Sequence, residues 1–266
     1  MQESPPNLLA ERRGSVLTLT LNRPEALNSL DGALIAALQR ALDEAAEQRE
    51  VRCVVLTGAG RAFCAGQDLK DPAVAPDDGS VKDLGDVVER NYKPLALRLR
   101  AMPVPTVAAV NGVAAGAGAS LALLCDIAIA RRGASFVQAF SALGLIPDTG
   151  ATWVLPRLAG RARALGLCLL GEKLPAERAE QMGLIWACVD DAAFESEVVA
   201  VAARLAALPV RALARTRALL DRGLGTSLEA ALDAEAQAQR ELGFASDFAE
   251  GVAAFAQKRP PRFTDR

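Results

Sequence analysis

Two stretches of small residues could bring main-chain donors to a ligand. Residues 62–69 contain an Ala-Gly-Gln-Asp sequence, and residues 111–120 are mostly glycine and alanine. Small side chains let a backbone approach a ligand closely, and the first turn of a helix carries free N–H groups at its positive end. Two N–H groups that converge on one point form an oxyanion hole, which can stabilise a thioester enolate. Alternatively, both stretches are glycine-rich turns needed only for helix–strand packing.

Asp148 is the side chain that could move a proton. Its apolar neighbours, such as Ile146 and Trp153, should raise its pKa toward the range useful for acid/base work. Alternatively, Asp148 is the N-cap of a helix over residues 149–158, because aspartate is a preferred capping residue. The chain has no histidine, which excludes a Ser-His-Asp triad, a Cys-His pair and any His-bearing zinc site. Carboxylates, backbone amides or a cofactor must therefore perform any chemistry.

The segments that must position these residues alternate between strand and helix patterns. Strands are predicted at residues 16–21, 51–57, 106–110, 127–130 and 135–138. Helices are predicted over residues 31–49, 84–101 and 117–124. The first of these helices has an apolar face made of Leu34, Ile35, Leu38, Leu42 and Ala45. The alternation indicates an α/β fold with largely parallel strands, and residues 71–83, rich in Pro, Gly and Asp, are predicted to form a mobile loop.

The organisation changes near the C-terminus. Strand patterns end at Val189, and the pattern is helical from Phe194 to Gln257. We therefore expect a core over residues 1–192 and a helical region over residues 193–266. The second region is too short to build a stable core of its own, so it should pack on the first region or on another subunit. Oligomerisation is the expected outcome.

Four ordered motifs carry a family resemblance. The two small-residue stretches follow residues 22–28 (Asn-Arg-Pro-Glu-Ala-Leu-Asn) and precede residues 144–150 (Gly-Leu-Ile-Pro-Asp-Thr-Gly). Together they resemble the crotonase (enoyl-CoA hydratase/isomerase) superfamily over about residues 10–265. The resemblance implies a ββα spiral core, a C-terminal helical trimerisation region, and homotrimers that often pair as hexamers. It also implies an acyl-CoA substrate and no cofactor beyond the coenzyme A that the substrate carries.

The resemblance further assigns roles to single residues. The two oxyanion N–H groups would belong to Gln67 and Ala117. Contacts to adenine and pantetheine would come from Arg23, Ala26, Ala65, Asp68 and Leu69. Lys258 resembles the residue that meets the CoA phosphate, and Phe140 could line the acyl pocket or equally belong to the core.

Two departures from the family pattern narrow the reaction. Hydratases of the family carry glutamates at the positions that are Ser120 and Phe140 in this chain. Adding water across an alkene needs one group that activates the water and one that delivers a proton. Serine and phenylalanine supply neither at neutral pH, whereas the single carboxylate of Asp148 suffices to move a proton between two carbons of an enolate. The residues therefore favour an isomerase.

Within the superfamily, residues 110–118, 136–148 and 155–171 resemble the isomerases of phenylacetate degradation. This implies conversion of 2-(1,2-epoxy-1,2-dihydrophenyl)acetyl-CoA to oxepin-CoA, a shift of the double bond of a 3-enoyl-CoA, or both. The alternatives are an enoyl-CoA hydratase, or an acyl-CoA hydrolase or dehalogenase with Asp148 as nucleophile. A further alternative is a non-catalytic CoA-binding subunit.

Composition limits partners and location. Thirty basic and 32 acidic residues give a formal charge of −2, which offers no basic field for nucleic acid or an anionic membrane. The apolar stretch at residues 104–130 includes Asn111, Ser120 and Asp126, a composition that favours close packing over lipid exposure. The five cysteines are odd in number and lack CxxC spacing, as expected of reduced thiols, and the proline-broken acidic N-terminus does not read as a secretory signal. We expect a cytoplasmic protein with no metal site and no membrane span.

Overall fold

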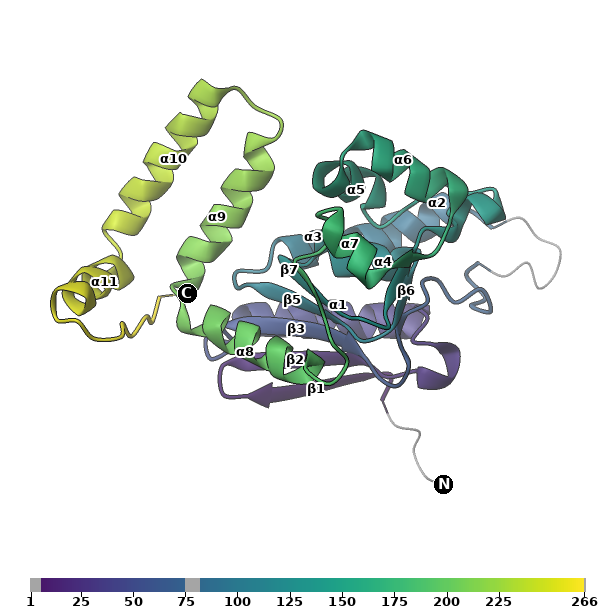
Figure 1. Cartoon of the computed structure of the whole chain (residues 1–266), viewed down its shortest axis with the longest axis horizontal. Coiled ribbons are helices and arrows are strands. Elements are labelled where there is room, and N and C mark those ends of the chain that lie inside the picture. The colour runs from purple at the N-terminus through teal and green to yellow at the C-terminus, as the bar shows by residue number, and fades with distance from the viewer. Residues whose placement is uncertain (1–5, 75–81, 266) are drawn as a thin grey trace.

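A computed structural model describes residues 6–74 and 82–265 of the chain, and Figure 1 shows their arrangement. In the described residues the larger sheet has the strand order β1-β2-β3-β5-β7-β10 and the smaller sheet the order β4-β6-β8-β9. The larger sheet consists of β1 (Leu8–Arg13), β2 (Val16–Leu21), β3 (Cys53–Gly58), β5 (Thr106–Val110), β7 (Ile127–Arg131) and β10 (Ala187–Val189). The smaller sheet consists of β4 (Ala62–Cys64), β6 (Val113–Ala115), β8 (Ser135–Val137) and β9 (Leu174–Pro175).

The two sheets are built from one repeated unit. Each of β3, β5 and β7 is followed, after a short turn, by a strand of the smaller sheet, namely β4, β6 and β8. The pairs β3–β5, β5–β7, β4–β6 and β6–β8 are all parallel, and β1 pairs with β2 antiparallel. This winding is the ββα spiral, so the predicted fold class is confirmed.

Helices connect the strands and cover them. The N-terminal part contains the 3-10 turn η1 (Pro24–Ala26), α1 (Gly32–Glu47), α2 (Leu84–Val87), α3 (Lys93–Arg100) and α4 (Ala117–Leu124). The 3-10 turn η3 (Ala139–Leu143) then leads to α5 (Ala151–Ala159), α6 (Arg161–Leu170) and α7 (Ala176–Gln181). The C-terminal helices are α8 (Phe194–Ala207), α9 (Val210–Gly223), α10 (Leu228–Gly243) and α11 (Ser246–Ala256).

Strand alternation gives the larger sheet two apolar faces. In β3, Val54 and Leu56 join the core formed with α1, α3 and α4, whereas Cys53 and Val55 join a second core under α8. The predicted apolar face of α1 is confirmed residue by residue, and Asp31 starts that helix because its carboxylate accepts the N–H of Leu34 at 2.7 Å.

The structure corrects the predicted helix over residues 84–101 and describes only part of the predicted loop over residues 71–83. The helix predicted over residues 84–101 is divided by a π-helical turn, Val88–Tyr92, in which the N–H of Lys93 bonds to the carbonyl of Val88. Pro94 has no N–H to continue the regular ladder, which explains the wider turn at this point. Of the predicted loop, residues 75–81 lie outside the described residues.

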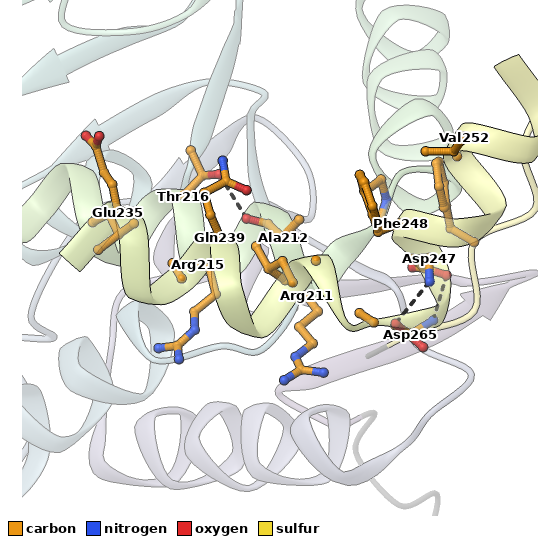
Figure 2. A pocket seen from close by; sticks show the side chains of 18 of the residues that line it. Arg211, Ala212, Arg215, Thr216, Glu235, Gln239, Asp247, Phe248, Val252 and Asp265 are labelled. Atoms are coloured by element: carbon orange, nitrogen blue, oxygen red, sulfur yellow. Dashed lines mark hydrogen bonds between the residues drawn. The ribbon is translucent and has the colours of Figure 1, made fainter. Parts of the chain in front are cut away.

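The helices α9, α10 and α11 extend to one side of the sheets (Figure 1). They enclose an open groove of about 1010 Å³, whose apolar residues include Leu232, Phe248 and Phe255, and Figure 2 shows the side chains around it. Phe255 is 87% exposed. Within residues 6–74 and 82–265, none of the helices combines the length and the apolar character that crossing a bilayer requires.

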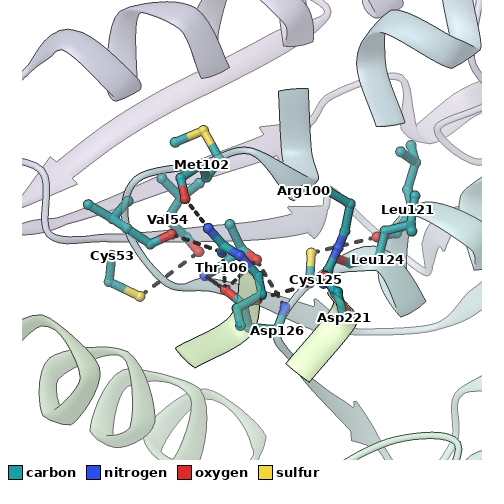
Figure 3. A network of polar contacts seen from close by, with 12 residues as sticks. Cys53, Val54, Arg100, Met102, Thr106, Leu121, Leu124, Cys125, Asp126 and Asp221 are labelled. Carbon is teal, nitrogen blue, oxygen red and sulfur yellow. Dashed lines mark hydrogen bonds and ion pairs between the residues drawn. The ribbon is translucent and has the colours of Figure 1, made fainter. Parts of the chain in front are cut away.

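An ionic network joins α9 to the start of β5 (Figure 3). The carboxylate of Asp126 accepts the N–H of Thr106 at 2.8 Å and the guanidinium of Arg217, on α9, at 2.8 Å. Arg217 also donates to the carbonyl of Met102, and Arg100 pairs with Asp221 of α9. Asp126 therefore has a structural role, because it joins α9 to the strand edge.

Replacing Asp126 with alanine should reduce the free energy of unfolding by about 2 kcal/mol, because it leaves the N–H of Thr106 without its side-chain acceptor and the part-buried guanidinium of Arg217 without its carboxylate partner. Asp43→Ala is the control, since the Arg98–Asp43 pair is exposed and its loss should cost less than about 1 kcal/mol. Urea unfolding of both variants checks this. Equal losses would contradict a special role of the Asp126 network.

Candidate active site

The two small-residue stretches lie directly against each other. A Cβ atom built on Gly66 would lie 2.8 Å from the carbonyl oxygen of Ala115 and 3.5 Å from the nitrogen of Ala117. A Cβ on Gly118 would lie 2.4 Å from the carbonyl oxygen of Cys64. Only glycine permits this approach, and Gly66 also has a φ of +90°, which glycine adopts most readily. Close packing therefore brings the start of α4 against the loop after β4.

This contact places two main-chain donors on neighbouring segments. Ala117 is the first residue of α4, so its N–H has no intrahelical partner. Gln67 forms an isolated parallel bridge with Leu30, but its own N–H takes no part in it. The N–H of Leu30 donates to the carbonyl of Gly66, and the N–H of Asp68 donates to the carbonyl of Leu30. No acceptor among the described residues receives the N–H of Gln67 or of Ala117. Both donors are thus available to a ligand.

The loop after β4 is held by the segment that follows β2. The guanidinium of Arg23 lies 2.8 Å from the carboxylate of Asp68 and 3.2 Å from that of Asp31. The hydrogen bond from the N–H of Lys70 and, with a smaller effect, the one from Arg23 stabilise the charged form of Asp68 and lower its pKa. Buried Asn28, with a φ of +57°, donates to the carbonyl of Ala62 at 2.8 Å. The Arg23 side chain is therefore engaged within the protein.

The other residues that the sequence assigned to CoA fall in two groups. Ala65 and Ala26 are half-buried near the same segments, since the N–H of Ala65 bonds to the carbonyl of Leu27 at 3.0 Å, and Leu69 is largely exposed. Lys258 is separate. It follows α11, which Figure 1 places on the opposite side of the molecule from α4, so one chain alone does not bring Lys258 to this cluster.

Asp148 is tied to α4 through Ser120. The buried hydroxyl of Ser120 donates to the backbone carbonyl of Asp148 at 3.2 Å. The capping alternative is wrong, because Thr149 and Gly150 both have positive φ and the N-cap position of α5 falls on Gly150. Burial raises the pKa of the Asp148 carboxyl, as expected, although a hydrogen bond from the Thr149 hydroxyl at 2.9 Å opposes the shift. The Asp148 side chain is therefore a half-buried carboxyl with no capping duty.

The aromatic side chains of Phe140 and Trp153 differ in position. A Cβ on Gly116 would lie 3.5 Å from the ring of Phe140, so this ring covers the turn that leads into α4. Trp153 instead carries the guanidinium of Arg157 at 4.1 Å and that of Arg100 at 5.9 Å from its ring centre. Phe140 thus adjoins the turn that precedes the Ala117 N–H, and Trp153 packs against arginines.

Tyr92 is the residue that sequence reasoning missed. Its side chain is buried, and its hydroxyl donates to Oε1 of Gln67. Burial, and next the charge of Asp148, raise the pKa of Tyr92, so this hydroxyl lies within electrostatic reach of that carboxylate. The only available signal was that Tyr92 is the sole tyrosine of the chain.

The cysteine that precedes the loop after β4 does not supply a reactive thiolate. Cys64 is buried beside the donors, and burial raises the pKa of its thiol to about 12, so it stays protonated at neutral pH. In the part of the chain that the structure describes, no group of three or more His, Cys, Asp or Glu side chains could hold a metal ion.

Comparison with known proteins agrees with this architecture. Residues 11–266 match the family model described as enoyl-CoA hydratase/isomerase. The chain is 50% identical to the 1,2-epoxyphenylacetyl-CoA isomerase of Escherichia coli K12, over 97% of this chain and 98% of that protein. It is 36% identical to the 2,3-dehydroadipyl-CoA hydratase of the same organism, over 97% of this chain and 99% of that protein.

A solved structure gives the same result. The crystal structure of an enoyl-CoA hydratase from Bacillus anthracis superposes with a TM-score of 0.90 at 32% identity, covering 98% of this chain and 100% of that one. The chain therefore belongs to the enoyl-CoA hydratase/isomerase family, the crotonases, and is an enzyme.

Proposed function

We propose that this enzyme, which acts on a CoA thioester, is an acyl-CoA isomerase. Its substrate is 2-(1,2-epoxy-1,2-dihydrophenyl)acetyl-CoA, which it converts to oxepin-CoA, or a 3-enoyl-CoA whose double bond it shifts, or both. The observation that carries the proposal is the single half-buried carboxyl of Asp148 attached to α4, whose first residue supplies an unpartnered N–H. The 50% identity to an epoxyphenylacetyl-CoA isomerase supports the ring substrate.

In the proposed mechanism the thioester oxygen accepts hydrogen bonds from the N–H groups of Gln67 and Ala117. These donors stabilise the negative charge that develops when a proton leaves the carbon next to the thioester. The carboxylate of Asp148 takes that proton and returns it to the carbon two positions further along, which moves the double bond into conjugation. Ring expansion of the epoxide needs mainly polarisation and positioning, so it should depend less on Asp148.

Hydration is disfavoured by the residues that face the same turn. Ser120 is buried and its hydroxyl is engaged with backbone carbonyls of Gly116 and Asp148. Phe140 covers Gly116 with an apolar ring. Neither side chain activates a water molecule at neutral pH, so we expect slow hydration.

The test is the mass of the product. The protein is incubated with epoxyphenylacetyl-CoA, a 3-enoyl-CoA and a 2-enoyl-CoA, and the products are followed by mass and absorbance. Isomerisation leaves the mass unchanged. A product heavier by one water would indicate a hydratase, free CoA would indicate a hydrolase, and binding without any turnover would indicate a non-catalytic subunit. Release of halide from a halogenated acyl-CoA would indicate a dehalogenase.

The raised pKa of Asp148 predicts a pH dependence of stability. Between its ordinary value of 3.8 and the raised value, the folded protein holds a proton that the unfolded chain has lost. The free energy of unfolding therefore falls as the pH rises through this window, and Asp148→Asn removes that fall. Thermal unfolding should show the variant as the more stable protein at neutral pH but not well below pH 3.8. The same difference at both pH values would contradict the raised pKa.

We also propose that the protein is a homotrimer or a hexamer of two trimers. Support comes from the exposed apolar side chains of α10 and α11, since a monomer rarely leaves a patch of this kind open to water. Lys258, for which we propose a contact with CoA, follows α11 and so lies in the same region. Light scattering during gel filtration tests this, and a monomeric mass would contradict it.

A further inference from the structure

Tyr92 connects the core to the loop that carries one of the two donors. We propose that Tyr92 is a positioning residue, whose hydroxyl holds the side chain of Gln67 so that the Gln67 N–H stays directed at the thioester oxygen. This inference rests on the proposed function. It assigns a role to a buried hydroxyl that otherwise has no part in the mechanism.

The local structure explains why Tyr92 reaches this loop. It is the last residue of the π-helical turn before α3, and it shares its buried side with Leu95 and Leu99. The wider turn is fixed from outside, because the side-chain amide of Gln39 on α1 donates to the carbonyl of Asn91 at 2.9 Å. π-Helical turns inside helices are frequent at functional sites. The ring is therefore firmly placed, and only its hydroxyl extends to Gln67.

Gln67 is restrained on both of its sides. Its backbone neighbours bond to Leu30, and its own side-chain amide group donates to the carbonyl of Asp68 at 3.0 Å while Oε1 accepts from Tyr92. With the Tyr92 bond in place, the peptide between Gly66 and Gln67 is held between the Leu30 bridge and the side chain. Without it, the side chain can rotate and the N–H loses one restraint.

The surroundings keep the hydroxyl in its donating form. Burial and the charge of Asp148 both raise the pKa of Tyr92, so the phenol remains neutral wherever the carboxylate is active. A neutral phenol donates a hydrogen bond to the amide oxygen of Gln67. The contact should therefore be present throughout the working pH range.

Tyr92→Phe removes the hydroxyl and keeps the ring. We expect kcat for the 3-enoyl-CoA to fall about tenfold while KM changes less than about twofold, because a displaced donor weakens transition-state stabilisation more than binding. Gln67→Ala keeps the main-chain N–H and removes the partner, so it should cause a similar loss. The double variant should lose no more than either single variant.

The control is Thr106→Val, which removes another buried hydroxyl. Thr106 is the first residue of β5, at the end of the strand away from α4, so this variant should leave kcat unchanged. Full kcat in Tyr92→Phe would overturn the inference, and so would losses that multiply in the double variant. Failure of the proposed function looks different, since the wild type would then isomerise none of the thioesters.

A second readout does not depend on turnover. Because the chain has one tyrosine, protein labelled with ¹³C at the tyrosine ζ-carbon gives one resonance. This resonance should move in Gln67→Ala and on addition of a saturated acyl-CoA, while Thr106→Val should leave it in place. If the chemical shift of this resonance were the same in Gln67→Ala as in the wild type, the contact between Tyr92 and Gln67 would be contradicted, whatever the activity of the variant.

Discussion

Replacing Asp148 with asparagine is expected to slow the double-bond shift of a 3-enoyl-CoA by about 10²- to 10⁴-fold, the usual contribution of a positioned acid/base. The substitution keeps the shape of the side chain and removes its ability to take a proton. The backbone carbonyl that accepts the Ser120 hydroxyl is unchanged, so the fold and the attachment to α4 should persist. KM should change little, because the carboxylate is not among the groups proposed to bind CoA.

The two proposed substrates separate the roles within the site. Ring expansion of the epoxide should lose less than the double-bond shift does, since the two main-chain donors remain in the variant. Steady-state rates with both thioesters, beside thermal unfolding to verify the fold, give the comparison. If folded Asp148→Asn kept wild-type rates with every thioester, Asp148 would not be the acid/base.

Gly118→Ala is expected to affect both stability and activity strongly. The added Cβ would meet the carbonyl oxygen of Cys64 at 2.4 Å and its Cβ at 2.6 Å. Neither atom can move away by rotation of a side chain, so α4 and the loop after β4 must move apart. Overpacking of this kind costs about 1–3 kcal/mol of unfolding free energy. The same movement separates the N–H groups of Ala117 and Gln67, and a displacement near 1 Å can cost about 10²-fold in kcat/KM.

The matched control is Gly166→Ala in α6. No atom lies within 4 Å of the Cβ position there, so the alanine should stabilise the helix by up to about 1 kcal/mol and leave the rate unchanged. Urea unfolding and steady-state kinetics of both variants make the comparison. Wild-type kcat/KM in Gly118→Ala would show that the spacing of these two segments does not control catalysis.

The sequence predicts the regular elements well where the signal is local. Asp31 and the apolar residues of α1 identify that helix, and the structure confirms both its start and its buried side. The run at residues 106–110 becomes β5, and the Gly-rich stretch after it opens α4 as expected. Such features depend on neighbouring residues only, so a single sequence contains them.

The environment of Asp148 could be predicted only in part. The predicted rise in the pKa is confirmed and comes from burial, but Ile146, one of the two apolar neighbours expected to cause it, is 77% exposed. The capping alternative fails because Thr149 and Gly150 take left-handed backbone conformations, which delay α5 until Ala151. A conformation of this kind at a non-glycine residue such as Thr149 is set by tertiary packing and not by its type.

Tyr92 was beyond prediction for a related reason. A helical pattern with the usual period does not predict a π-helical turn. The hydrogen-bond partner of Tyr92, Gln67, also lies 25 residues earlier in the chain. Only packing of the π-helical turn against the loop after β4 brings them together. The isolated bridge between Leu30 and Gln67 is a contact of the same type.

The most direct measurement is a crystal structure of Asp148→Asn with a bound 3-enoyl-CoA. The account predicts that the thioester oxygen lies within hydrogen-bonding distance of the main-chain nitrogens of Gln67 and Ala117, with the residue 148 side chain beside the carbon next to the thioester. A thioester oxygen bound elsewhere, or a residue 148 side chain turned away from the acyl group, would contradict the proposed mechanism.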